Sequence, residues 1–329
     1  MKPHFSVIMP LYNKSPYVRK ALESVVSQTY RNFELIIVDD GSTDNSAAIC
    51  EDFFNSFTPS FVHSLIRQAN SGVAAARNNG VAASHGEFLC FLDADDWWSP
   101  TFLEEIDKLI TEYPDVGIYA TNYFYYKPGK THVALNLPSG YMNYPEAYLQ
   151  GPMPIWTGAT CMPRCVFDEM GGFPIGIKLG EDFLLWAKTA LHYPVAFCEK
   201  PLAYYNNDVP ASLRATRNLH EPRYHMLFNL APLEAEIKKQ VESGRWKVER
   251  SLEWKALLDW LRVNGLMDYW IDSRYHDAAA AELEKVDWSM QSNRVVHLYK
   301  TPIWILKAKR RFMQIGSFFK QTLIKLSRL

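Results

Sequence analysis

Apolar runs and amphipathic segments alternate along the first part of the chain. Apolar runs of strand length occur at residues 5–9, 33–38, 61–67 and 87–92. Each run is followed by a segment with helical spacing or helix-forming composition, at residues 15–30, 42–54, 71–86 and 99–114. Continuously apolar strands that alternate with helices are typical of a mostly parallel sheet covered by helices on both faces. The pattern therefore predicts an α/β fold of the Rossmann-like kind.

Two of these helices begin with the same dipeptide. Ser15-Pro16 and Ser99-Pro100 each precede a helical pattern. Serine is a favoured N-cap, and proline is tolerated at the first helical position because its missing N–H has no partner there. We therefore expect the helices to start at these serines.

The pattern becomes less regular after Tyr113. An aromatic strand is predicted over residues 117–126, a stretch rich in Pro and Gly covers residues 127–154, and the chain beyond about Arg217 looks entirely helical. We expect an α/β domain at residues 1–215 and a helical C-terminal region with a basic amphipathic end at residues 216–329.

The formal net charge of −1 hides a strong asymmetry. All 36 Asp and Glu residues lie within residues 1–287, with 26 of the 35 Lys and Arg residues. From Trp288 to the end there are nine basic residues and no acidic one. A basic segment on an acidic body indicates an anionic partner for that segment.

The last residues have the spacing of a basic amphipathic helix. The apolar positions Phe312, Ile315, Phe319, Leu323 and Leu326 step by 3, 4, 4 and 3. Such a helix binds an anionic membrane surface or packs on its own domain, and the sequence leaves both readings open. We name residues 294–329 as the candidate membrane contact and expect no nucleic acid as partner.

The cysteines and the N-terminus give no sign of export. The five cysteines are scattered and form no zinc-binding spacing, so we expect reduced thiols. The N-terminal segment meets Pro10 and Asn13 too early for a signal peptide, and no uncharged apolar run has the length of a membrane span. These observations predict a cytoplasmic protein, or one peripheral on the inner face of the membrane.

Polar side chains follow three of the predicted strands. They are Tyr12 and Asn13 after the first, next to Pro10, then Asp39 and Asp40 after the second, and Asp93, Asp95 and Asp96 after the fourth. In parallel α/β sheets, ligands bind beyond the carboxyl ends of the strands, so we expect these groups to converge at one edge.

The segment "DADD", residues 93–96, allows two interpretations. Aspartates are common in solvated turns and before helices. Paired carboxylates on a loop also suit Mg²⁺ or Mn²⁺, which keep waters and bind substrate phosphates. The phosphate loop "GxxxxGK[ST]" and the dinucleotide motif "GxGxxG" are both absent from the sequence.

Several motifs together resemble one family. "SVIMPLYNKSPYVRKALESVVSQTY", "FELIIVDDGSTDNS", "SGVAAARNNGVAASHG" and "EFLCFLDADDWW" occur in the order and spacing of the inverting glycosyltransferases of family 2, which have a GT-A fold. The resemblance covers roughly residues 4–210. It favours the metal site over the solvated turn as the interpretation of "DADD".

The resemblance implies roles for the residues at the strand ends. Pro10, Tyr12 and Asp40 match positions that contact the nucleotide base, with Asp39 assisting or capping the turn. Arg77 lies in a segment near the nucleotide phosphates. Asp93 and Asp95 match the D-x-D motif, in which Asp95 binds the divalent metal, Mn²⁺ or Mg²⁺, and Asp93 lies near the ribose or the metal. Asp96 is expected behind them.

A second acidic pair, Glu181-Asp182, stands at the start of a predicted helix. Two acids in a first helical turn are favoured by the helix dipole alone. By resemblance, Asp182 is the catalytic base and Glu181 orients it or contacts the donor sugar. The resemblance also places Trp156, Thr157 and Gly158 at the sugar and acceptor pocket, although a buried Trp156 in the core is an equal alternative.

The sequence departs from the family in two places. Where many members have a histidine after the base helix, this chain has "YYNNDVPAS", so a third metal ligand at Asn207 or Asp208 is in doubt. The "QxxRW" motif of processive synthases is absent, which favours the addition of one sugar per visit.

Together these features predict a metal-dependent inverting glycosyltransferase that uses a nucleoside-diphosphate sugar, most simply a UDP-sugar. Its acceptor would be a glycan or lipid-linked glycan in bacterial surface-polysaccharide synthesis. The alternatives are an inactive module that binds nucleotide sugars or glycans, and a nucleotidyltransferase. The latter lacks support because "MPLYNKSPY" has no Gly-rich basic loop.

Overall fold

The structure is a computed structural model, and it describes residues 4–56, 59–151, 153–210 and 221–306. These residues form two compact units, Met1–Leu257 and Leu258–Leu329. The first unit contains a mixed sheet with helices around it, and the second contains helices only. The strands are β1 Phe5–Leu11, β2 Phe33–Asp39, β3 Val62–Arg67, β4 Phe88–Phe91, β5 Trp97–Trp98, β6 Ile118–Tyr126, β7 His132–Val133, β8 Gly140–Met142, β9 Thr160–Pro163 and β10 Val195–Asn206.

The helices cover most of the segments that the sequence pattern predicts. They are α1 Val18–Val26, α2 Ser46–Asn55, α3 Val73–Ala82, α4 Phe102–Glu112, α5 Tyr144–Gln150, α6 Arg164–Met170, α7 Glu181–His192, α8 Ala231–Glu242, α9 Val248–Gly265, α10 Met267–Ile271, α11 His276–Leu283 and α12 Asn293–Lys300. Short 3-10 helices occur at η1 Thr157–Ala159, η3 Pro222–Tyr224, η4 Met226–Phe228 and η5 Trp288–Met290.

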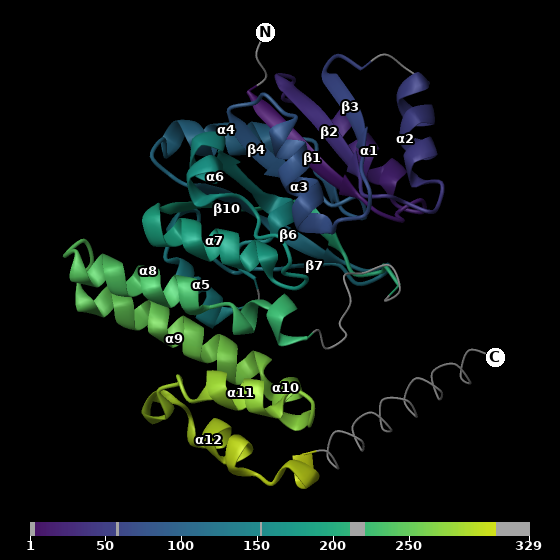
Figure 1. Cartoon of the computed structure of the whole chain (residues 1–329). Coiled ribbons are helices and arrows are strands. Elements are labelled where there is room, and N and C mark those ends of the chain that lie inside the picture. The colour runs from purple at the N-terminus through teal and green to yellow at the C-terminus, as the bar shows by residue number, and fades with distance from the viewer. Residues whose placement is uncertain (1–3, 57–58, 152, 211–220, 307–329) are drawn as a thin grey trace. The chain divides into compact units, whose positions relative to one another are not determined.

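The sheet has the strand order β3-β2-β1-β4-β9-β6-β10-β5, with β7 beside β6 and β8 beside β10. The pairs β3–β2, β2–β1, β1–β4 and β6–β10 are parallel, whereas β9 lies antiparallel between β4 and β6. The predicted α/β class with a mostly parallel sheet and a helical C-terminal region is therefore confirmed. Figure 1 shows β1, β2 and β3 side by side, and α3 packs against β1 and β2.

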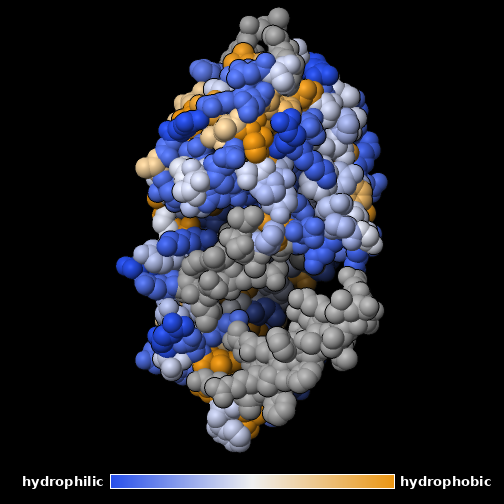
Figure 2. Space-filling model, turned by 90° about the vertical axis from the view of Figure 1, so that its right-hand side faces the viewer, coloured by the Kyte–Doolittle hydropathy of each residue, from blue (hydrophilic) through white to orange (hydrophobic). Residues whose placement is uncertain are grey.

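The core is built on the central strands. Every residue of β1 and β2 is buried, which explains why these strands are mostly apolar in the sequence. At the edge, β3 is only partly covered. Figure 2 views the side of the molecule where β3 and α2 lie, and it shows a mostly hydrophilic surface with scattered hydrophobic spots.

The predicted starts of two helices are wrong by a few residues. Helix α1 begins at Val18 rather than at Ser15, because the N–H groups of Tyr17 and Val18 both bond the carbonyl of Lys14 and close a turn first. Helix α4 begins at Phe102 rather than after Ser99, whose N–H donates to the carbonyl of Leu202 at 2.7 Å. In both cases contacts outside the helix decide where it starts.

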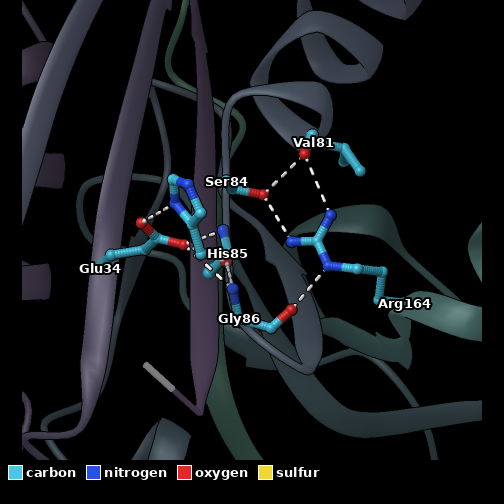
Figure 3. Close-up of polar contacts among 7 residues, drawn as sticks. Glu34, Val81, Ser84, His85, Gly86 and Arg164 are labelled. Carbon is cyan, nitrogen blue, oxygen red and sulfur yellow. Dashed lines mark hydrogen bonds and ion pairs between the residues drawn. The ribbon is translucent and has the colours of Figure 1, made fainter. Parts of the chain in front are cut away.

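A buried carboxylate at the N-terminal edge of the sheet fixes the start of β4 (Figure 3). Glu34 accepts hydrogen bonds from the hydroxyl of Ser6 at 2.7 Å, from the N–H of Gly86 at 3.1 Å and from the N–H of His85. Burial by itself raises the pKa of Glu34, but these hydrogen bonds lower it overall.

Gly86 and Arg164 complete this connection. A Cβ on Gly86 would come within 2.6 Å of the Ser6 nitrogen, so only glycine allows the two backbones to approach. Arg164 bonds the Gly86 carbonyl at 2.7 Å, the Val81 carbonyl at 3.1 Å and the Ser84 hydroxyl at 2.7 Å (Figure 3). The connection between α3 and β4 is thereby held rigidly, and β4 delivers the "DADD" segment at its other end.

The second unit has its own buried contacts. Arg262 is almost fully buried and pairs with Glu282 at 3.1 Å. Tyr299 of α12 packs edge-on against Trp270 and Trp288. The boundary that we expected between residues 215 and 216 lies outside the described residues, and it stays a prediction. No helix in the described part of the chain is long and apolar enough to span a bilayer. The predicted amphipathic segment that starts at Phe312 also lies outside the described residues.

All five cysteines are free, as predicted, and four of them are buried.

Candidate active site

Arg77 brings two acidic segments of the chain together. Its side chain lies on α3 and is 4% exposed. One terminal nitrogen is 2.8 Å from Asp93 Oδ1, directly after β4, and the other is 3.0 Å from Glu181 Oε1 at the start of α7. The D-x-D segment and the Glu181-Asp182 pair therefore share one site, which we call the carboxylate cluster (Asp93, Asp95, Glu181 and Asp182).

The local sequence fixes Glu181 and Asp182 at the start of α7. Gly180 precedes the helix with φ of +82°, a conformation that L side chains avoid, and a Cβ there would also meet Met226. The two acids then occupy the first helical turn, where carboxylates are favoured by the helix dipole. The predicted helix start after Gly180 is confirmed.

The negative charge of Glu181 is unfavourable in the carboxylate cluster. Burial and the neighbouring charge of Asp182 raise the pKa of Glu181 to about 7, against the opposing effect of Arg77. Burial alone would lower the pKa of Arg77, but the charges of Asp93, Glu181 and Asp182 raise it overall. Arg77 thus stays charged, and Glu181 changes its protonation near neutral pH.

Asp182 is held by a hydroxyl group. Thr157, in η1, donates a hydrogen bond of 2.9 Å to Asp182 Oδ2, and the indole nitrogen of Trp186 lies 3.3 Å from the same hydroxyl oxygen. Because the Thr157 oxygen accepts from Trp186, its proton is directed at the carboxylate. No short sequence pattern indicates this contact, since the two residues are 25 positions apart.

The segment around Thr157 is otherwise part of the core. Trp156 is buried and packs against Tyr123 and Tyr205, and its ring lies directly over Gly158, where a Cβ would be 2.4 Å away. The Gly158 carbonyl accepts from the Trp98 indole at 2.6 Å. Of the two readings left open for Trp156, these contacts favour the core.

The other acids of "DADD" differ in their surroundings. Asp95 Oδ2 lies 2.5 Å from the ammonium of Lys14, which belongs to the loop after β1. Burial and the charge of Asp93 raise the pKa of Asp95, against the effect of Lys14. Asp96 is fully buried and accepts from the Asn206 N–H at 2.7 Å, and burial followed by the charges of Asp95 and Asp93 raises its pKa well above the usual value. Asp96 thus lies behind the cluster, tied to the end of β10.

The expected base-binding residues lie at the ends of β1 and β2. Pro10 is buried in β1, whereas Tyr12 is 45% exposed. The Asp40 carboxylate accepts from the N–H groups of Ser71 at 2.7 Å and Gly72 at 2.9 Å, and from the Gln68 amide at 2.7 Å. Asp40 therefore holds the loop that leads into α3, a contact that the sequence did not suggest.

The residues present are suited to a divalent cation. The contact between Asp95 and Lys14 tests this suitability. The mostly buried Asp95 carboxylate already attracts one positive charge, the Lys14 ammonium. The described residues contain no group of three His, Cys, Asp or Glu side chains able to hold a metal. Asp93 and Asp95 would thus supply one or two oxygens, and Mg²⁺-type ions complete such shells with waters and substrate phosphates. Asp208 belongs to no such group in the described part of the chain, and the third ligand expected near Asn207 or Asp208 stays in doubt.

The fold and the site define a class: an α/β protein whose carboxylates gather at the carboxyl ends of parallel strands. Comparison with known proteins gives the family. Residues 6–167 match the sequence model described as "Glycosyl transferase family 2". This segment, just under half of the chain, is therefore similar to glycosyltransferase family 2.

Relatives and solved structures agree with this assignment. The chain is 40% identical over 121 residues to glycosyltransferase GlyA of Streptococcus pneumoniae, a match that covers 36% of this chain and 16% of GlyA. It is 36% identical over 126 residues to the minor teichoic acid biosynthesis protein GgaA of Bacillus subtilis, with coverage of 37% and 28%. The matched segment is thus well under half of either relative.

Two solved structures share the fold. TarS 1–349 of S. aureus in complex with UDP-GlcNAc matches with a TM-score of 0.62 at 18% identity, over 86% of this chain and 88% of that chain. The mannosyltransferase PcManGT of Pyrobaculum calidifontis, in complex with GDP-Man and Mn²⁺, matches with a TM-score of 0.53 at 20% identity, over 99% and 87%.

Proposed function

We propose that the protein transfers a sugar from a nucleoside-diphosphate sugar, most simply a UDP-sugar, to a hydroxyl group of an acceptor with inversion. The observation that carries this proposal is the pair of contacts from Arg77 to Asp93 and Glu181, which joins the D-x-D segment to a second carboxylate pair. The D-x-D segment then lies at the donor diphosphate, and the Glu181-Asp182 pair lies at the acceptor hydroxyl. The family assignment and the UDP-GlcNAc complex of TarS support this reading.

Asp182 is the proposed base. In an inverting transfer, the acceptor oxygen forms a bond to the anomeric carbon while the bond from that carbon to the diphosphate oxygen breaks. The acceptor proton must be taken up at the same time, and Asp182 accepts it on the carboxylate that Thr157 holds in place. Transfer needs no other covalent step from the protein.

Arg77 is the proposed partner of the donor diphosphate. Its side chain is fully charged, and its Nε is buried without a hydrogen-bond partner among the described residues. A buried donor of this kind is costly unless a ligand or water satisfies it. Tyr12 and Pro10 are retained as proposed contacts of the nucleotide base, and Asp40 as a residue that shapes this end of the site.

Asp93 and Asp95 are the proposed ligands of Mn²⁺ or Mg²⁺. When bound, the cation would supply positive charge to the departing diphosphate. The Mn²⁺ and GDP-Man complex of PcManGT supports this cofactor class.

The acceptor is proposed to be a glycan or lipid-linked glycan of a bacterial surface polysaccharide, extended by one sugar per visit. Its support is the relationship to GgaA, which is named for teichoic acid biosynthesis.

The second unit offers a surface for an anionic membrane. Helix α12 has no buried residue, Met290 and Trp304 are 78% and 73% exposed, and Arg294 and Lys300, which lie between them in the sequence, are exposed too. Exposed apolar side chains beside basic ones suit a bilayer with anionic lipids. Flotation with anionic and neutral vesicles tests this: we expect the full chain to bind anionic vesicles only, and Trp304→Ser to weaken binding. Equal flotation of the chain and its Trp304→Ser variant would overturn the membrane proposal.

The transferase proposal is tested by nucleotide release. A panel of UDP- and GDP-sugars is incubated with Mn²⁺, with and without acceptor glycans, and the released nucleotide is measured. We expect diphosphate nucleotide release that depends on acceptor and is abolished by Asp182→Asn, while nucleotide-sugar binding by thermal shift persists. Pyrophosphate release would indicate a nucleotidyltransferase, and binding without turnover for every acceptor would indicate an inactive binding module.

A further inference from the structure

Lys14 has no role in the reaction described so far, yet it reaches into the carboxylate cluster. Its backbone N–H donates to the hydroxyl of Ser46 at 2.7 Å, which fixes the loop after β1. Its ammonium lies 2.5 Å from Asp95 Oδ2, and both side chains are only 15% exposed. Lys14 thus supplies a positive charge at the oxygen proposed to bind a divalent cation.

Electrostatics explains why Lys14 and Asp95 form an ion pair. A mostly buried carboxylate next to Asp93 is unfavourable without a nearby cation, and removal of one partner of a buried ion pair leaves an uncompensated charge. In the protein without donor, Lys14 supplies that cation. A divalent cation at the same oxygen would supply more charge, and the two cannot occupy it together.

Among the described residues, the cluster contains a second cation that is held by two ion pairs. Arg77 is bound to two acids, and its guanidinium lies 5.1 Å from the centre of the Phe173 ring. Lys14 stands on a loop, and a lysine ammonium is a compact charge on a flexible four-carbon stem. Lys14 is therefore the cation of the cluster that can leave its acid.

We propose that Lys14 competes with the divalent cation for Asp95. In the donor-free protein its ammonium occupies the acid and keeps metal affinity low. When a metal and a nucleotide sugar bind together, the metal takes Asp95 and the ammonium is released beside the incoming diphosphate. This inference rests on the proposed function, since it deepens the role of the same site.

The competition has a measurable size. If the ammonium occupies Asp95 for about nine-tenths of the time, the apparent metal affinity is about tenfold weaker than the intrinsic one. By linkage, a donor that draws the ammonium away raises the metal affinity, and the metal raises the donor affinity by the same factor.

The test is a Mn²⁺ titration of the full donor-free chain, followed by the electron paramagnetic resonance signal of free Mn²⁺. We expect Lys14→Met to bind Mn²⁺ about tenfold more tightly than the unmodified chain. Lys14→Arg, which keeps a cation, should retain weak binding. The matched control is Lys108→Met, which removes an exposed lysine paired with Glu104 and Glu105 on α4 and should leave Mn²⁺ affinity unchanged.

A second substitution assigns the effect to the right acid. Adding Asp95→Asn to Lys14→Met should remove the gain in Mn²⁺ affinity. Thermal unfolding shows whether each variant is folded. If Lys14→Met does not fold, Lys14→Gln takes its place in the titration. Equal Mn²⁺ affinity of the unmodified chain and a folded Lys14 variant would overturn the competition, as would a gain that survives Asp95→Asn.

Failure of the proposed transferase function can be distinguished from failure of the competition between Lys14 and the metal. If no nucleotide sugar binds but Lys14→Met gains Mn²⁺ affinity at Asp95, the competition stands and the proposed function falls. If nucleotide sugars bind and turn over but the Lys14 variants show no gain, the competition falls alone.

Discussion

A terminal nitrogen of Arg77 lies 3.0 Å from Glu181 Oε1, although the two residues are 104 positions apart in the chain. The same guanidinium reaches Asp93 at 2.8 Å. One buried cation thus neutralises acids from two different segments and fixes the distance between them. The proposed reaction needs this relationship, because donor and acceptor must meet between those segments.

Arg77→Met should therefore damage both stability and ligand binding. Removal of a buried cation leaves Asp93 and Glu181 uncompensated, and we expect a loss of about 3–5 kcal/mol in the free energy of unfolding. Arg77→Lys should rescue it only in part, because an ammonium cannot make both planar contacts. The control is Arg67→Met, which breaks an exposed pair with Glu51 and should change stability by less than about 1 kcal/mol. Urea unfolding measures all three, and a similar effect at Arg67 would contradict the argument.

Thr157→Val tests the hydrogen bond to Asp182. Valine keeps the shape of threonine but donates no proton, so the carboxylate loses its fixed orientation. We expect kcat to fall about tenfold, as for the loss of one hydrogen bond to a charged group, with the KM for donor little changed. Thr157→Ser, which keeps the hydroxyl, should restore most of the rate. A serine variant as slow as the valine variant would argue against the hydrogen bond as the cause.

Glu181 predicts a distinct dependence of stability on pH. Its pKa is raised to about 7 from an ordinary value of 4.5, so the folded protein binds this proton more tightly than the unfolded chain. The contribution of Glu181 to stability is therefore fully present below pH 4.5 and is lost as the pH rises to about 7.

Glu181→Gln removes this titration. Relative to the unmodified chain, we expect the variant to gain up to about 3 kcal/mol between pH 4.5 and 7.5. Chemical denaturation at several pH values in the presence of EDTA gives the measurement. A constant difference between the two proteins across this range would show that Glu181 titrates normally.

For Glu34, at the other edge of the sheet, we expect the opposite dependence of stability on pH. Its pKa is lowered by hydrogen bonds, so its contribution is present above pH 4.5 and is lost as the pH falls through its lowered value. Glu34→Leu leaves the N–H groups of His85 and Gly86 without an acceptor and should cost about 2–4 kcal/mol at pH 7.

The matched control for Glu34 is His85→Ala. The His85 side chain is 75% exposed, and its removal should change stability by no more than about 0.5 kcal/mol. The difference between the Glu34→Leu variant and the unmodified chain should shrink at strongly acidic pH. A difference independent of pH would point to lost packing instead of lost charge.

Much of the architecture could be predicted from local pattern. The buried strands β1 and β2 are mostly apolar because both faces are covered, and a run of consecutive residues is enough to show this property. The start of α7 after Gly180 could also be predicted. The starts of α1 and α4 could not, because a turn closed on the Lys14 carbonyl and a bond from Ser99 to the Leu202 carbonyl determine them.

The linear sequence is enough to predict the α/β class and the acids at the strand ends, and to match residues 6–167 to a family model. These features depend on residue type and short spacing, which a linear chain records. The folded structure is needed to show that Arg77 joins Asp93 to Glu181, that Thr157 holds Asp182, and that Lys14 reaches Asp95. Such contacts join residues 16 to 104 positions apart, and their energies depend on burial, which no short stretch of sequence contains.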